Sequence, residues 1–293
     1  MPPLRIATRG SQLAMIQTRL VAARLQALGV EVELVPVVSQ GDLRPPGTAP
    51  GEGVFVAALE QALLAGEADL AVHSAKDMPL VAEPDLVVAA YPERADPRDA
   101  LVGTTLADAV AGARVGTDSL RRAGFLLRLR PDLRHQPLHG NVDTRLRKLD
   151  AGEADLLVLA AAGLDRLGRA DRVATRFAPE EVTPAGGQGA LAVQARRSDR
   201  RVRELLAALD RPDLRLEVDA ERAVLEATGG TCRSPVGALA RASGGSVELL
   251  AAAVMPDGTH HHLVLLSGAW GEAPRLAARA GRELLERVPL GGL

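Results

Sequence analysis

The chain has 293 residues, of which 47% are hydrophobic and 25% charged, with a formal net charge of −2. This balance argues against a basic nucleic-acid-binding protein, and the composition is typical of globular proteins rather than disordered or fibrous ones. Only 2% of the residues are aromatic, which excludes a binding surface built on stacked rings. We therefore expect two or three domains with aliphatic cores, and a ligand that is held by charge.

The start of the chain and its single cysteine bear on location. The first residues lack the basic, apolar and small-residue regions of a signal peptide, and no apolar run approaches the roughly 20 residues that span a bilayer. Cys232 cannot form a disulfide within the chain, which fits a reducing compartment. The sequence therefore predicts a cytoplasmic protein with no membrane segment.

The first ninety residues alternate strands and helices. Hydrophobic periodicity predicts four strands and two helices. The strands are expected at 4–7, 31–38, 69–74 and 86–90, and the helices at 11–28 and 54–64. Residues 39–53 are rich in glycine and proline, which predicts an exposed loop long enough to act as a lid over a site.

A polar connection at 93–99 marks a domain boundary, after which the alternation restarts. Strands are predicted at 113–116 and 155–159, and helices at 119–130 and 142–149. Residues 65–72 are nearly repeated at 151–158, and residues 7–11 are loosely matched at 116–119. Chance similarity in an alanine-rich chain is the alternative, but the equivalent placement favours two α/β domains of like build with a cleft between them.

The last part of the chain has a different pattern. A helix at 219–227 and a glycine-rich turn at 229–232 precede strands at 246–254 and 262–267 and a helix at 274–286. This order predicts a small α+β domain.

Two segments combine charged side chains with the junction of a predicted strand and a predicted helix. Thr117, Ser119 and the pair Arg121-Arg122 lie where a strand meets a helix, so hydroxyls, free backbone N–H groups and guanidiniums can converge on an anion. Thr8 to Ser11 repeats this arrangement in the first domain. Taken singly, each segment also fits a capped surface helix with solvated arginines.

The pair Lys76-Asp77 follows a buried strand and is stopped by Pro79. Opposite charges at a strand end suit a desolvated acid, although a structural ion pair is an equal alternative. A further helix begins at residues 140–148, with Asn141 or Asp143 available as its cap and Arg145 within its first turns; in isolation this segment fits a plain amphipathic helix better than a binding site.

Cys232 follows two glycines and precedes Arg233, so it lies on a tight turn. A lone cysteine is usually a small buried hydrophobe, but this setting also suits a reactive or covalently modified thiol. Histidines 260–262 are expected at the surface, and no spacing of metal ligands or phosphate-binding loop is present in the sequence.

Together these segments resemble the hydroxymethylbilane synthase (porphobilinogen deaminase) family over almost the whole chain, and their order and spacing are specific. They are 5–11 (RIATRGS), 72–79 (VHSAKDMP), 96–100 (DPRDA), 116–122 (GTDSLRR), 140–146 (GNVDTRL), 187–190 (GQGA) and 230–232 (GTC). The resemblance implies two α/β domains like periplasmic binding proteins around a cleft, plus a small α+β domain that carries the cysteine. It implies domain bounds of 1–92 plus 189–207, 96–185 and 212–293; the return of the chain to the first domain rests on the resemblance alone.

The resemblance also implies a transferase of heme biosynthesis. It would condense four porphobilinogen molecules head to tail into hydroxymethylbilane, with loss of ammonia, on a dipyrromethane primer joined by a thioether to Cys232. The family suggests a monomer that needs no metal and passes its product to the next enzyme of the tetrapyrrole pathway.

The site residues implied by the resemblance fall into three groups. Asp77 is the catalytic acid. The cofactor would be held by Cys232, Lys76, Asp77, Thr117, Ser119, Arg121, Arg122 and Arg145. The substrate would be bound by Arg9, Ser11, Gln17, Phe55, His139, Arg166 and Gln188.

Two positions depart from the family pattern. His139 stands where the family usually has arginine, and Glu52 stands where it often has lysine. The first change removes a permanent cation and the second adds a negative charge, so elongation is expected to be slower or more dependent on pH. The alternatives are a stalled synthase that retains its cofactor, and a two-lobed module that binds an organic anion without chemistry.

Overall fold

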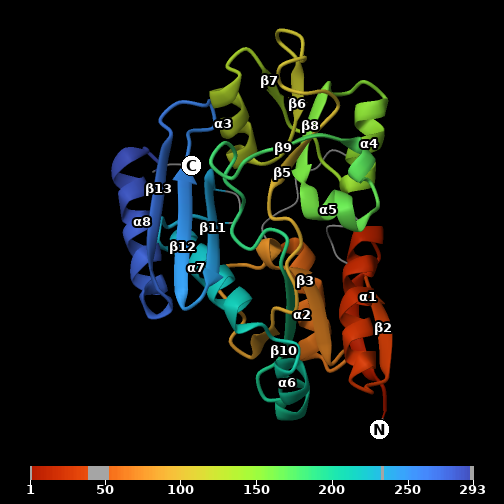
Figure 1. The fold of residues 1–293 in the computed structure, drawn as a ribbon. Helices are drawn as coiled ribbons and strands as arrows, with labels where there is room; N and C mark the ends of the chain where they lie inside the picture. The colour runs from red at the N-terminus through yellow and green to blue at the C-terminus, as the bar shows by residue number, and fades with distance from the viewer. Residues whose placement is uncertain (1, 39–52, 232–233, 291–293) are drawn as a thin grey trace.

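The computed structural model describes residues 2–38, 53–231 and 234–290, without the side chains of Val54 and Phe55. They form two five-stranded sheets and one three-stranded sheet. Figure 1 shows the first sheet near the N-terminus, the second above it, and the third beside both, with each sheet flanked by helices.

The first sheet has the strand order β2-β1-β3-β10-β4. Its elements are β1 (Leu4–Arg9), α1 (Gln12–Ala27), β2 (Val32–Val37), α2 (Val54–Leu64), β3 (Leu70–Ser74), the 3-10 turn η1 (Ala75–Asp77), β4 (Leu86–Ala90), β10 (Leu191–Arg196) and α6 (Arg200–Ala207). Strand β1 is parallel to β2 and β3, whereas β10 runs antiparallel between β3 and β4.

The second sheet has the order β7-β6-β8-β5-β9, with the same strand directions. Its elements are β5 (Asp99–Val102), β6 (Arg114–Gly116), α3 (Leu120–Leu129), β7 (Arg134–Gln136), α4 (Val142–Asp150), β8 (Leu156–Ala160), α5 (Ala161–Arg166), η2 (Ala170–Arg172) and β9 (Val173–Arg176). The repeated residues 65–72 and 151–158 lead into β3 and β8, which take the same place in the two sheets. The internal repeat is therefore structural.

Two crossovers join the sheets, one from β4 to β5 and the other from β9 to β10. The first leads into β5, the antiparallel strand of the second sheet, and the other leads back into β10, the antiparallel strand of the first sheet. They pair with each other, because the Ala95 N–H donates to the Gly189 carbonyl over 3.0 Å and Arg94 bridges to Ala190. Gly189 has φ +85, and a Cβ there would lie 2.4 Å from the Ala95 oxygen. Only glycine therefore allows the two crossovers to approach this closely.

The third sheet is antiparallel, in the order β11-β12-β13. Its elements are α7 (Pro212–Ala227), β11 (Val236–Ser243), β12 (Ser246–Ala253), β13 (His262–Ala269), η3 (Trp270–Glu272) and α8 (Ala273–Arg287). Helices α7 and α8 share an aliphatic core with the sheet. Strand β11 begins against the second crossover, since the Ala238 N–H donates to the Pro184 carbonyl over 2.9 Å.

The structure confirms two α/β domains around a cleft and a small α+β domain, and it corrects some predicted elements. Residues 93–99 are not only a connection, because Asp99 begins β5. The helix predicted at 219–227 begins earlier, at Pro212, where the fixed φ of proline suits the first helical turn. The strands β5, β7, β9, β10 and β11 and the helices α5 and α6 are not among the predicted elements. Strands β7 and β9 have only three and four residues, too few to show a period.

Candidate active site

A cleft of about 550 Å³ lies between the first two domains, where the ends of their parallel strands meet. The residues after β1, β3, β6 and β8 all contribute to its lining. Its charged lining among the described residues comprises six cations and three carboxylates: Arg9, Lys76, Arg122, Arg145, Lys148 and Arg166, with Asp77, Asp118 and Asp143. This charge balance suits a ligand that carries several negative charges.

The first-domain wall is built on β1 and β3. Strand β3 ends at Ser74, and the turn η1 directs Lys76 and Asp77 into the cleft while Met78 is buried behind them. Asp77 is exposed to the cleft. Ser11 caps α1, with its Oγ accepting from the Ala14 N–H over 3.4 Å, and it shares this wall with Arg9 and Gln17.

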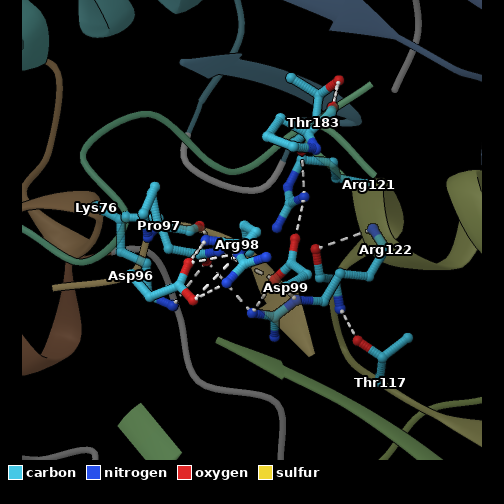
Figure 2. A network of polar contacts seen from close by, with 12 residues as sticks. Lys76, Asp96, Pro97, Arg98, Asp99, Thr117, Arg121, Arg122 and Thr183 are labelled. Atoms are coloured by element: carbon cyan, nitrogen blue, oxygen red, sulfur yellow. Dashed lines mark hydrogen bonds and ion pairs between the residues drawn. The ribbon is translucent and has the colours of Figure 1, made fainter. Parts of the chain in front are cut away.

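A buried carboxylate, Asp99, holds two neighbouring arginines, Arg121 and Arg122 (Figure 2). Its side chain is 0% exposed; Oδ2 accepts from Arg121 Nη1 over 2.6 Å, and Oδ1 lies 2.8 Å from Arg122 Nη2. Burial alone would raise the pKa of Asp99, but the two guanidiniums outweigh it and hold that pKa well below its ordinary value. Asp99 is therefore ionised and fixes both arginines.

Gln188 extends this network toward the cleft. Its Nε2 donates to Asp99 Oδ1 over 3.1 Å and to the Pro97 carbonyl over 2.7 Å. Its Oε1 accepts from Lys76 Nζ over 3.3 Å and from Arg122 Nη2 over 3.4 Å. Burial, reinforced by the positive charge of Arg122, lowers the pKa of Lys76 to about 8.

The second-domain wall carries a further charge cluster. Asp118 Oδ1 lies 2.7 Å from His139 Nδ1, and its Oδ2 accepts from Arg145 Nη2 over 3.2 Å. Asn141 caps α4 by accepting from the Thr144 N–H over 2.9 Å, and this places Arg145 in the first turn of that helix. Asp118 thus holds a histidine and an arginine together at this wall of the cleft.

His73 also lines the cleft and was not expected there. It is 5% exposed, on β3. Burial lowers the pKa of His73 to about 4, although Gln194 acts in the opposite direction. His73 is therefore neutral at physiological pH.

The predicted site residues fall into two sets. Those that line the cleft are Arg9, Ser11, Gln17, Lys76, Asp77, Arg122, His139, Arg145 and Arg166. Those placed behind its wall are Thr117, Ser119, Arg121 and Gln188. Ser119 caps α3 and Thr117 Oγ1 accepts from the Ser119 N–H over 3.2 Å, while Arg121 binds Asp99 and the Thr183 carbonyl. Cys232, Glu52 and the side chain of Phe55 lie outside the described residues.

Asp99, Asp118 and His73 also belong to the site, although the sequence did not predict them there. Each lies inside a quoted motif, but the residue types alone do not reveal which side chain turns inward. Asp99 is separated from Arg121 by 22 residues along the chain, so only the folded sheet brings them together. Among the described residues, no group of three His, Cys, Asp or Glu side chains could hold a metal ion, and no helix is long and apolar enough to cross a membrane.

Comparison with known proteins decides between an enzyme and a plain anion-binding module. The family description "Porphobilinogen deaminase, dipyromethane cofactor binding domain" matches residues 4–204, and "Porphobilinogen deaminase, C-terminal domain" matches residues 215–286. The chain belongs to the porphobilinogen deaminase family. It is a transferase of tetrapyrrole and heme biosynthesis that condenses porphobilinogen into hydroxymethylbilane on a dipyrromethane cofactor, and the binding-module alternative is not favoured.

Curated relatives match along nearly the whole chain. Porphobilinogen deaminase of Acidothermus cellulolyticus is 48% identical over 96% of this chain and 88% of its own length. That of Chromobacterium violaceum is 46% identical over 98% and 94%. A solved periplasmic substrate-binding protein of an ABC transporter from Coxiella burnetii is 18% identical, with a TM-score of 0.43 over 72% of this chain and 93% of its own.

Proposed function

We propose that Asp77 is the general acid of the condensation. It would protonate the departing amine of porphobilinogen, and its carboxylate would then stabilise the cationic methylene-pyrrole and its N–H. The observation that carries this proposal is the position of Asp77 at the end of β3, opening into a cation-lined cleft beside Lys76. Because Asp77 is exposed here, bound pyrroles or a closing of the cleft must screen it from water.

The cationic side chains of the cleft are proposed to clamp the acetate and propionate groups that each pyrrole carries. Arg9, Arg145 and Arg166 are arginines, whose planar fork suits bidentate binding of a carboxylate. Gln188 holds Lys76, and Asp99 holds Arg122, from the side away from the cleft. Both cations are therefore already oriented when a substrate carboxylate binds. Ser11 and Gln17 add neutral donors at the same wall.

The donor set fits dipyrromethane, a molecule with four carboxylates. Besides its cations, the cleft has buried Nε donors of Arg145 and Arg166 without a partner among the described residues. Such unused donors suit an anionic ligand. When bound through Cys232, the cofactor supplies the pyrrole carbon to which the first substrate is joined; Lys76, Arg122 and Arg145 would hold and orient it.

The residues behind the wall are proposed to act through others. Arg121 has no side-chain surface on the cleft, and its contacts keep Asp99 and the second crossover in place. Gln188 positions Lys76 and Arg122, and Thr117 and Ser119 shape the start of α3. These residues would thus support the cofactor site rather than touch the cofactor.

The departure at His139 is proposed to slow the enzyme rather than to stall it. His139 lies beside Asp118 in the lining of the cleft, where an imidazole N–H can still donate to a substrate carboxylate. Glu52 is still expected to slow elongation, because it adds a negative charge near anionic substrates.

The remaining proposals concern organisation. Domain bounds of 1–92 plus 189–207, 96–185 and 212–293 agree with the sheet memberships of β10, β5 and β11. The family resemblance supports a monomer that passes its product to the next tetrapyrrole enzyme, and the single cysteine supports a cytoplasmic location.

The role of Asp77 is tested by comparing Asp77→Asn with Asp77→Glu, both as folded holoenzyme. Loss of the proton donor should lower the rate of ammonia release by about 10²–10⁴-fold in Asp77→Asn. Asp77→Glu keeps a carboxyl group and should recover part of that loss. Equal rates in wild type and Asp77→Asn would contradict the assignment.

A further inference from the structure

Glu93 lies on the first crossover, just after β4, and is bound by an arginine from each domain. Its Oε1 accepts from Arg166 Nη2 of α5 over 3.2 Å, and its Oε2 accepts from Arg24 Nη2 of α1 over 2.9 Å. The side chains of Glu93 and Arg166 are 21% and 6% exposed, whereas Arg24 is 46% exposed. One carboxylate thus links both domains to the crossover between them.

The link uses a side chain that the cleft also needs. Arg166 lines the cleft, yet the same Nη2 that binds Glu93 also donates to the Gly189 carbonyl of the second crossover over 2.9 Å. Its Nε is buried and has no hydrogen-bond partner among the described residues. In this conformation Arg166 therefore binds both crossovers through Nη2, while its Nε remains an unused donor.

The same place is a direct contact between the domains. Helix α1 packs against α5, and a Cβ added to Gly163 would lie 3.6 Å from a methyl group of Leu13. The bridge from Arg24 through Glu93 to Arg166 spans these two helices. Its strength therefore affects how firmly the domains are held together at the cleft.

We propose that Glu93 is a positioning residue that competes with a substrate carboxylate for Arg166, and that its displacement loosens the contact between the two domains. The proposal rests on the proposed role of Arg166 as a substrate clamp. A carboxylate of the growing pyrrole chain has the same charge and geometry as Glu93, so it can replace Glu93 on the guanidinium. Each displacement thus couples binding of the pyrrole chain to a weaker contact between the two domains.

The competition predicts a change in KM of a definite sign. Glu93→Gln weakens the competitor, so KM for porphobilinogen should fall by about three- to tenfold, equivalent to about 0.7–1.4 kcal/mol. The kcat should not rise, because a pyrrole chain that Arg166 holds more tightly moves less readily through the cleft. A side chain that only supports the fold would instead leave KM unchanged or raise it.

Arg24→Gln is the matched control. It breaks the first-domain arm of the bridge but leaves Glu93 to compete for Arg166, so KM should stay at the wild-type value or rise. Glu93→Ala, which removes both contacts, should lower KM as Glu93→Gln does and serves if the amide variant does not fold. All variants are assayed as holoenzyme, with folding checked by thermal melting.

An unchanged or higher KM in folded Glu93→Gln or Glu93→Ala overturns the proposal, as does an equal fall in Arg24→Gln. Its failure is distinguishable from failure of the clamp itself: if Arg166→Gln leaves wild-type KM unaltered, Arg166 binds no substrate carboxylate. A wild-type chain that consumes porphobilinogen is the reference for every comparison.

Discussion

Replacing Asp99 by asparagine removes the negative charge that balances two buried arginines. Arg121 and Arg122 lie 2.6 and 2.8 Å from its oxygens, and their side chains are only 4% and 8% exposed. In the variant an amide NH₂, which cannot accept, also replaces one of the two oxygens that face the guanidinium N–H groups. Loss of one partner from a buried ion pair costs about 3–5 kcal/mol, because the remaining charges stay out of water without compensation.

The assay is thermal unfolding of the purified holoenzyme. At about 2–4 °C per kcal/mol for a chain of this size, Asp99→Asn should lower Tm by about 6–20 °C. The control is Asp155→Asn, which removes a carboxylate that binds the single Arg114 through both oxygens at the surface, where both side chains are about 40% exposed. Solvent screens that pair, so the control should unfold close to wild type.

The pH dependence gives a second check on the same variant. The guanidiniums hold the pKa of Asp99 below its ordinary value of about 3.9, so its contribution is complete above that pH and is lost as the pH falls further. The difference in Tm between wild type and Asp99→Asn should be constant from pH 5 to 8 and shrink below pH 4. A difference under about 2 °C at pH 7 would refute the charge-balance argument.

Three further predictions concern the titratable groups of the cleft. His139→Arg restores a permanent cation where the family usually has arginine, so KM for porphobilinogen should fall, whereas His139→Gln should raise it; an unchanged KM in both variants would contradict a role of His139 in substrate binding. Because burial lowers the pKa of Lys76 to about 8, Lys76→Arg should keep a low KM at pH 9 where wild type loses affinity, and parallel profiles would count against it. The lowered pKa of His73, about 4, means that only the unfolded chain binds its proton between about pH 6.5 and 4, so stability should fall by about 3 kcal/mol across that window. His73→Gln should remove this slope, measured by urea unfolding, and an unaltered slope would show that His73 does not cause it.

Much of the fold follows from local pattern. Periodicity and capping residues place α1, α2 and β3 within a residue or two of their observed ends, since Ser11 and the glycine after α1 act on the helix that they flank. The exchange of strands between sheets does not follow, because β10 pairs with β3 across more than a hundred residues. Such pairing depends on the packing of whole domains.

The site shows the same division between local and distant causes. The pair Lys76-Asp77 is marked by the buried strand before it, and both side chains line the cleft. Arg121 and Arg122 are indistinguishable in sequence, yet successive helix positions point about 100° apart, so one faces the Thr183 carbonyl and the other the cleft. Which of them can touch a ligand is decided by the crossover that packs on α3.

The proposed reaction requires the cleft to extend a pyrrole chain that is covalently attached to Cys232. We would therefore compare the intact masses of the purified protein and Cys232→Ser by mass spectrometry, before and after addition of porphobilinogen. Wild type alone should carry a mass excess equal to dipyrromethane, which should grow in pyrrole steps with substrate. An excess that never grows would indicate a stalled synthase, and a folded wild-type protein that gains no mass with porphobilinogen would rule out covalent elongation on Cys232.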